Sequence, residues 1–317
     1  MDLSLQQMRM LQALSHHGTI AAAAEALGYT PSAVSQQLSA LERSAGVAVL
    51  ERVGRNVLLT AAGRELVVHA SLMLAQMEQA QAAMERVRGE VGGTITLGVM
   101  ESVASAMLAR LLEVIAERHP HLRVRTRSSD FGDQFAMLRS GELDLAFVVE
   151  YPDAPSALPT GISRQRVLND SFHLVVPEGR VGEFPELVPL EMLEGEPFIA
   201  PPVTDPCGVA VLQACRRAGF EMDAAHQLVD YPVALRMVSK GVALSLVPDL
   251  GLRRQPEGIA VLPIAEPFYR AIDLAFRTAS AERPAVQGTI QAVRDVIDEI
   301  GFEAVRDGDA APLAAAG

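Results

Sequence analysis

The stretch "TPSAVSQQLSALE", Thr30 to Glu42, decides the N-terminal fold of this 317-residue chain. Thr30 is a good helix N-cap, and Pro31 suits the first helical position, where a missing N–H costs nothing. One face of the helix is apolar, because spacings of four and three residues join Val34, Leu38 and Leu41. The opposite face carries small polar and cationic side chains: Ser32, Ser35, Gln36, Ser39 and Arg43. The sequence therefore predicts a helix with one buried side and one free polar side.

Two shorter helices precede this helix, and a hairpin follows it. Residues 5–14 carry leucine and methionine at helix spacing, and Gly18 ends that run, so His16 and His17 are interpreted as a surface helix end. Thr19 can then cap a second helix. After Gly46, residues 47–60 form two short β-prone runs around Gly54, which is typical of a small hairpin wing.

The polar face fits recognition of the DNA major groove, since glutamine can pair with adenine in a bidentate manner and serine reaches bases or phosphates. Arginines on a wing would contact the DNA backbone or a narrow minor groove of the DNA. A merely solvated helix face would have the same composition, so these residues alone leave both interpretations open. The candidate DNA-contacting residues are Thr30, Ser32, Ser35, Gln36, Gln37, Ser39, Arg43, Arg52 and Arg55.

A single long helix is predicted over residues 63–89, which contain almost no helix breakers. Its apolar residues alternate spacings of four and three over roughly three heptads, the seam of a coiled coil. An amphipathic helix packed on its own domain would show the same stripe. We predict dimerisation through this seam, with candidate residues Leu66, Met73, Met77 and Met84.

The remaining chain has the alternation of an α/β fold. Glycines at positions 89, 92 and 93 mark a hinge, after which β-prone runs at 94–99, 121–126 and 143–149 alternate with helical segments. A similar unit restarts at Phe172, with later strand candidates at 197–200, near 227–229 and at 242–248, and with helices from Gly208 and Tyr231. We predict two lobes, one from residues 93–163 and 268–302 and the other from residues 164–267, joined by strands near 162–168 and 264–276.

Composition describes a globular chain, with 49% hydrophobic and 21% charged residues. The formal net charge is −12, but through Arg64 five arginines balance four acidic residues. Binding to nucleic acid would therefore need a local, shaped site and only a few phosphate contacts. Neither a signal-peptide pattern nor a long apolar run is present, so we expect a cytoplasmic protein without membrane attachment.

Residues 21–63, "AAAAEALGYTPSAVSQQLSALERSAGVAVLERVGRNVLLTAAG", resemble the winged helix-turn-helix of the LysR-type transcriptional regulators. Weaker family marks are "SGELDLAF" at 140–147 and "VSKGVALSLVP" at 238–248. The family often has Gln-Pro in place of Pro31-Ser32, Arg or His in place of Gln36, and usually Phe in place of Leu50. The first two departures bear on which bases are read, and the third is a packing change.

The resemblance implies three regions: a DNA-binding domain at 1–62, a linker helix at 63–89, and a two-lobed effector domain at 90–302 similar to periplasmic binding proteins. A flexible tail is expected at 303–317, because its end is low in bulky residues. The resemblance also implies a homodimer, usually paired again into a homotetramer, on promoter DNA. Two-fold symmetry predicts an inverted repeat with half-sites about 34 Å apart or a multiple of that distance. A small-molecule effector between the lobes and RNA polymerase would be further partners.

The effector is expected at the carboxyl ends of the strands, where helix N-termini meet. Family members commonly use the loops that match Ser102, Ser129 and Thr204. Carboxylates at Glu101, Asp130, Glu150, Asp205 and Asp230 also fall near predicted strand ends and would favour an ammonium-bearing ligand, although 39 acidic residues would place some there by chance. The candidate effector-binding residues are Glu101, Ser102, Ser129, Glu150, Thr204 and Asp230.

Two cysteines, Cys207 and Cys215, raise a redox question, because some LysR-type regulators sense peroxide through two cysteines in this part of the second lobe. On one helix they would lie about 12 Å apart along its axis and could not bridge without unwinding. We expect a buried Cys215 and an inert Cys207 in a loop.

No enzyme motif or metal-ligand spacing is present, so neither an activity, a cofactor nor a metal is expected. The alternative function is a cytoplasmic small-molecule-binding module without a DNA role, which would need neither a polar recognition face nor a heptad seam.

Overall fold

The computed structural model describes residues 3–53, 56–89, 91–128, 133–152, 157–302, 304 and 305. Its N-terminal part is a winged helix-turn-helix, with helices α1 (Leu5–His17), α2 (Ile20–Leu27) and α3 (Pro31–Ala45) followed by the antiparallel hairpin of β1 (Leu50–Val53) and β2 (Asn56–Leu59). Hydroxyl caps begin all three helices: Ser4, Thr19 and Thr30. Met8, Leu11, Val34, Leu38 and Leu41 are fully buried between the helices. The local sequence signals thus produce the predicted three-helix core.

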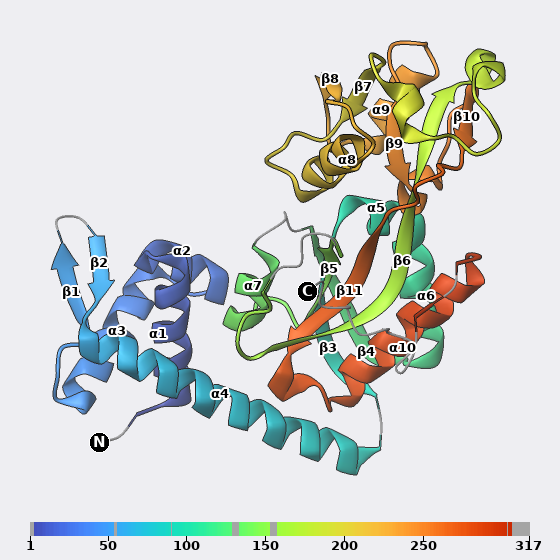
Figure 1. The fold of residues 1–317 in the computed structure, drawn as a ribbon. Helices are drawn as coiled ribbons and strands as arrows, with labels where there is room; N and C mark the ends of the chain where they lie inside the picture. Colours follow the sequence, from blue (N-terminus) through green and yellow to red (C-terminus); the bar gives the residue numbers. More distant parts are fainter. Residues whose placement is uncertain are drawn as a thin grey trace, which may run out of the picture.

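Helix α4 (Ala61–Arg88) is 28 residues long and leads from the wing to the rest of the molecule. Thr60 caps it, and the backbone of its first turn approaches the wing so closely that a Cβ at position 63 would lie 2.1 Å from the carbonyl oxygen of Val49. Only glycine fits there. The first half of α4 packs on α1, where Gln12 donates to Ser71, and the helix then runs beneath the remaining domain (Figure 1).

The principal sheet belongs to the first lobe and extends into the second. Its order is β10-β6-β11-β5-β3-β4, and β9 also pairs with β6. Strand β3 (Gly92–Val99) is parallel to both β4 (His121–Ser128) and β5 (Leu145–Glu150), as a βαβαβ unit requires. The long antiparallel pair β6 (Ile162–Pro177) and β11 (Tyr269–Arg277) crosses from one lobe to the other (Figure 1).

Helices cover both faces of this sheet. One face packs against α5 (Glu101–Val103), a π-helical turn at Ala104–Leu108, α6 (Ala109–Arg118) and α10 (Pro284–Glu299). The other face packs against α7 (Gln134–Ser140). Strand β5 shows the alternation directly, since Leu145 and Phe147 join the first cluster while Ala146 and Val148 join the second.

The second lobe is built around the far half of β6. Strands β9 (Ser245–Pro248) and β10 (Ile259–Leu262) pair with that half. Strand β7 (Pro197–Ala200) pairs in parallel with β8 (Asp223–Gln227), while α8 (Pro206–Arg217) and α9 (Tyr231–Val238) complete the lobe. Short 3₁₀ turns lie at Glu178–Glu183, Leu190–Leu193, Asp249–Leu252 and Thr278–Ser280.

Three predicted elements differ in extent from those observed. The crossing strand expected near 162–168 continues to residue 177, because β9 and β10 provide partners for its second half. The strand expected near 227–229 is β8, which ends at Gln227 because Asp230 caps α9. The tail proposed to begin at 303 includes Val305, whose N–H donates to the carbonyl of Val167, so the chain is still attached to β6 there.

No helix in the described ranges is long and apolar enough to cross a membrane. Over the same residues, no group of three or more histidine, cysteine or acidic side chains is arranged to hold a metal ion.

Candidate DNA-binding face and ligand cleft

The polar face of α3 is accessible. Ser32, Ser35, Gln36, Ser39 and Arg43 are all exposed, and Gln37 is half-buried, while the apolar side of the helix is buried against α1 and α2. Thr30 contributes differently, because its hydroxyl accepts the N–H of Ala33 and so caps the helix. The face therefore presents donors and acceptors that the described residues of the domain leave uncovered.

The wing is held against α3 by one carboxylate. Glu42 Oε1 accepts from the backbone N–H groups of both Val49 and Leu50, each at 3.0 Å. These two bonds hold the start of β1, the strand that carries the exposed Arg52, against the end of α3. Arg55 lies outside the described residues. The role of Glu42 was missed, since a carboxylate near a helix end has no distinctive sequence pattern.

The apolar stripe of α4 divides into two parts. Leu66 is half-buried against the helix-turn-helix core, and Ala70 is fully buried there. Further along, Met73 and Met84 are 39% and 58% exposed, and Met77 is half-buried. The two halves of the stripe therefore differ. The first half packs on its own domain, whereas the second half has exposed apolar side chains, among them Val87, and stays the predicted dimerisation seam.

Ion pairs join the linker helix to the first lobe. Arg277 at the end of β11 donates to Glu78 (2.6 Å) and also to Asp144 (3.1 Å). Arg283 pairs with Glu85 at 3.2 Å. A third contact joins His17 of α1 to Glu142 beside α7, with 2.8 Å between Nε2 and Oε1. The DNA-binding part and the first lobe are therefore in direct polar contact.

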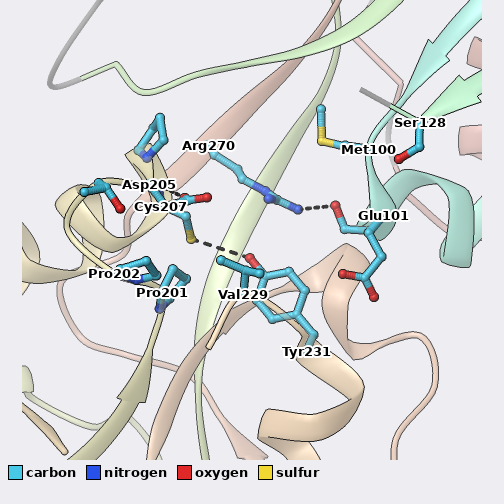
Figure 2. A pocket seen from close by; sticks show the side chains of 13 residues that line it. Met100, Glu101, Ser128, Pro201, Pro202, Asp205, Cys207, Val229, Tyr231 and Arg270 are labelled. Carbon is cyan, nitrogen blue, oxygen red and sulfur yellow. Dashed lines mark hydrogen bonds between the residues drawn. The ribbon is translucent and has the colours of Figure 1, made fainter. Parts of the chain in front are cut away.

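A cavity of about 450 Å³ lies between the lobes where the predicted ligand site was placed (Figure 2). The first lobe contributes the start of α5 and the end of β4, and the second lobe contributes the start of α8 and α9. Strand β11 crosses the base of the cavity. Its polar lining residues are Glu101, Ser102, Ser128, Thr204, Asp205, Cys207, Tyr231 and Arg270.

Arg270 is the cation of this cleft. Its Nε donates to Asp170 on β6 at 2.8 Å, and its Nη2 donates to Ser102 Oγ at 2.9 Å. Asp170 also accepts from the backbone N–H of Leu250 at 3.0 Å. Arg270 and Asp170 are 2% and 0% exposed. Burial raises the pKa of Asp170, while Arg270 acts in the opposite direction. The pair connects the two crossing strands to the first turn of α5.

Next to Arg270 lies the Cys207 thiol, beside the hydroxyl group of Tyr231. The Sγ of Cys207 and the hydroxyl of Tyr231 are 3.5 Å apart, and the Arg270 guanidinium lies 6.0 Å from the Tyr231 ring centroid (Figure 2). Burial raises the pKa of the Cys207 thiol, and the nearby Arg270 opposes that shift. Burial also raises the pKa of Tyr231. The expectation for Cys207 was wrong: it lies in the first turn of α8 and is 3% exposed.

The six candidate effector residues fall into four groups. Glu101, Ser102 and Thr204 line the cleft, and Ser129 lies outside the described residues. Asp230 accepts from Val233 N–H and caps α9. Burial raises the pKa of Glu101, and the nearby Asp230 adds to that shift. Glu150 is not part of the lining. It is 2% exposed and paired with Arg164. Arg164 lies on β6 and Glu150 on β5, and β11 pairs with both strands, so the sheet brings the two residues together.

Sequence reasoning missed Arg270, Tyr231 and the buried position of Cys207 in the lining of the cleft. The available signal was one arginine inside the apolar strand "YRAIDLAFR" at 269–277. A buried charge needs a partner, but Asp170 is 100 residues away in sequence.

Comparisons with known proteins agree with this architecture. Residues 5–64 match the family model described as "Bacterial regulatory helix-turn-helix protein, lysR family", and residues 88–298 match "LysR substrate binding domain". A "Probable hydrogen peroxide-inducible genes activator" of Streptomyces viridosporus is 27% identical, with 96% of this chain and 97% of the relative covered. GltC, a "Transcriptional dual regulator" of Bacillus subtilis, is 24% identical over 78% of this chain and 81% of its own.

Solved structures show the same fold. A full-length OxyR variant from Pseudomonas aeruginosa has a TM-score of 0.71 at 19% identity, covering 93% of this chain and 95% of its own. Full-length CbnR in complex with its target DNA has a TM-score of 0.55 at 23% identity, covering 93% and 99%.

Proposed function

Because the chain belongs to the LysR family of DNA-binding transcriptional regulators, we propose that it binds an inverted-repeat promoter site and changes that binding when a small polar molecule occupies the cleft. The observation that carries the proposal is the path between the two sites. Strand β11 holds Arg270 in the cleft and, seven residues later, Arg277 against the linker helix.

DNA recognition is supported by the exposed face of α3. In this proposal the exposed Gln36 reads a base edge, and the exposed Arg43 and Arg52 contact phosphates. We propose a homodimer formed through the exposed second half of α4, paired again into a homotetramer. Two recognition helices related by two-fold symmetry would then enter successive major grooves. RNA polymerase is a further partner in this proposal.

A response to ligand is supported by the way in which the lobes are connected. The cleft is lined by both lobes, so an occupant that contacts Ser102 and Thr204 together would favour one lobe arrangement over another. Strands β6 and β11 run through both lobes, and a changed arrangement would move the end of β11 where Arg277 contacts Glu78. The DNA-binding domains would thereby change their relative geometry.

The cleft in this proposal binds its ligand without converting it, as in a regulator rather than an enzyme. The protein would act in the cytoplasm, where its DNA is. Glu101, Ser102 and Thr204 are the proposed ligand contacts among the candidates, and Arg270 and Tyr231 join them on the basis of their positions in the lining.

The test is a footprint of the purified protein on the DNA upstream of its own gene, in moderate salt with excess competitor. We expect protection of an inverted repeat on one helical face. Genome-wide selection of bound fragments would cover operators elsewhere. If neither experiment enriches a symmetric sequence, the proposal of sequence-specific binding is wrong.

A second candidate function is a response to peroxide through Cys207. Its sulfur lines the cleft beside Arg270, and the relative from Streptomyces viridosporus is named for peroxide-inducible genes. The sulfur would take one oxygen from hydrogen peroxide, giving sulfenic acid and water. Two observations weigh against this function: burial raises the thiol pKa, and Cys215 lies eight residues along the same helix, about 12 Å away.

Mass spectrometry of protein treated with stoichiometric peroxide would decide between the two functions. Peroxide sensing would be supported if Cys207 is oxidised and the footprint shifts in the wild type, while peroxide no longer shifts the footprint of Cys207→Ser. An unmodified thiol under conditions in which a small ligand shifts the footprint would leave the ligand response alone.

A further inference from the structure

The cleft contains one guanidinium whose hydrogen-bonding capacity is only partly used. Arginine has five N–H donors. In Arg270, Nε donates to Asp170 and Nη2 to Ser102, whereas Nη1 has no acceptor among the described residues. The side chain is 2% exposed, yet it lines the cavity. Nη1 can therefore donate to a molecule in the cavity, and a carboxylate is the natural acceptor for a guanidinium.

The same cleft contains a carboxylate to which no described residue donates a hydrogen bond. This is Glu101, which begins α5 and lines the cavity. Burial, and then the neighbouring Asp230, raise its pKa. Asp205, also in the lining, uses one oxygen to cap α8. This edge of the cleft therefore favours a cation, because a cation would relieve the repulsion among the acidic groups.

The two charged ends lie close together. Glu101 and Ser102 are adjacent residues, and Ser102 Oγ is the acceptor for Arg270 Nη2 at 2.9 Å. Both side chains line the cavity, and Figure 2 shows the Arg270 guanidinium directed at the first turn of α5 and the Glu101 carboxylate beside the ring of Tyr231. Asp170 already balances the formal charge of Arg270, so a simple dianion would bring excess negative charge next to Glu101.

We propose that the cleft ligand is a small zwitterion, an amino acid or a similar amino-carboxylic acid, with its carboxylate on Arg270 and its ammonium group at Glu101. This inference rests on the proposed ligand response and specifies the chemistry of the ligand. The carboxylate would receive the free N–H groups of Nη1, and Ser102 would keep the guanidinium oriented. Arg270 is thus the specificity-determining residue for the anionic end.

The experiment uses the full-length protein and measures melting temperature and calorimetric binding. The probes are the twenty standard amino acids together with 4-aminobutyrate, succinate and putrescine, which share a four-carbon chain and differ in their end groups. We expect at least one zwitterion to bind. Removing its amine or its carboxylate should weaken binding tenfold or more, since each removal leaves a charged group of the cleft without a partner.

Two variants assign the ends. Glu101→Gln, at an exposed side chain, should weaken binding of the zwitterion tenfold or more. Binding of the amine-free analogue should be unchanged or tighter. Arg270→Lys keeps the charge of the buried pair but loses the fork, and should weaken every carboxylate-bearing probe. Glu117→Gln, a similar change at a 68% exposed carboxylate on α6, is the matched control and should change nothing.

Two sets of results would overturn the inference while leaving the regulator intact. In the first, the footprint persists and succinate or putrescine binds as tightly as any zwitterion. In the second, Glu101→Gln leaves the preference for the zwitterion unchanged. A protein that protects its operator but neither binds nor responds to any of these compounds also contradicts the zwitterion assignment. Loss of sequence-specific protection under every condition would instead contradict the proposed function.

Discussion

Arg277 on β11 donates its Nε hydrogen to Glu78 on the linker helix, with 2.6 Å between Nε and Oε1. The same guanidinium donates to the backbone carbonyls of Leu138 and Leu143 in the first lobe, each at 2.6 Å. One side chain therefore joins the sheet that crosses the lobes, helix α7 with the loop that follows it, and the helix that leads to the DNA-binding domain. This contact is a direct structural connection between the strand that lines the ligand cleft and the helix that carries the DNA-binding domain.

Removing that connection should uncouple the two sites. We expect Glu78→Gln to reduce the free energy of unfolding by on the order of 1 kcal/mol, because a partly buried charge-assisted bond is weakened. Amide hydrogen exchange should increase in the second half of α4, and ligand should no longer change the footprint, while DNA affinity without ligand persists. Glu65→Gln, at a 77% exposed position on the same helix, is the control. Identical behaviour of the two variants would contradict the coupling role of Glu78.

The recognition face should divide its roles between specificity and affinity. Gln36→Ala should cost about 1 to 3 kcal/mol on the operator and little on random DNA, because it removes a base contact. Arg43→Ala should weaken both DNAs and reduce the salt slope by about 1, as expected for one phosphate contact. Titrations at several salt concentrations measure both effects, with Gln76→Ala on α4 as the control. If Gln36→Ala and Arg43→Ala each lose the same affinity on the operator as on random DNA, the proposed division between specificity and affinity is wrong.

The overall salt dependence should be shallow. The segment through Arg64 is close to neutral and the whole chain carries a formal charge of −12, so few phosphates can be neutralised per protomer. We expect a slope of log affinity against log salt well short of about −10, the lac repressor value. A slope as steep as that would show that many more cations contact DNA than the exposed face of α3 and the wing provide.

The two halves of α4 should respond differently to substitution. Met73→Lys and Met84→Lys should raise the dimer dissociation constant about tenfold or more, because burial of a methionine side chain contributes roughly 1.5 to 3 kcal/mol. Sedimentation across a concentration series measures this change. Leu66→Ala should instead lower the melting temperature of the winged domain, since Leu66 packs on its core. A wild-type dimer in both lysine variants would place the dimer interface elsewhere.

His173 on β6 should make stability depend on pH. Its Nε2 lies 2.8 Å from Asp249, and this hydrogen bond is the main cause that raises the pKa of His173 in the folded state, with Asp170 adding to it. The stabilisation is fully present below the unfolded pKa of about 6.5 and is lost as the pH rises through the higher folded value. The difference in melting temperature between the wild type and His173→Gln should therefore shrink as pH increases. His69→Gln on α4 is the control, and a difference that grows with pH would contradict the assignment.

The DNA-binding half of the molecule could be predicted in detail because its signals are local. Threonine caps, proline at the first helical position and apolar spacings of four and three residues act within a few turns of helix. The same holds for the α/β alternation, which sequence patterns show strand by strand. In the cleft, the rule that ligands sit at strand ends correctly located Glu101, Ser102 and Thr204 in the lining.

Prediction was less successful where a side chain is positioned by a distant partner. Glu150 ends a strand, as the ligand-site rule requires, but Arg164 occupies its carboxylate because the sheet order brings β6 near β5. Cys207 was expected in a loop, and it is buried because α8 begins two residues earlier than predicted. The heptad stripe of α4 could not show which half packs on α1, since both environments select the same apolar spacing.

The sequence by itself determined the winged helix-turn-helix, the long linker helix and the two α/β lobes, because propensity, capping and hydrophobic periodicity are properties of neighbouring residues. Only the tertiary structure decided that Arg270 meets Asp170 and Ser102 in the cleft, and that Arg277 meets Glu78 on the linker helix. These partners lie 100, 168 and 199 residues apart in sequence. Their pairing follows from the crossing of β6 and β11 between the lobes, which no local pattern encodes.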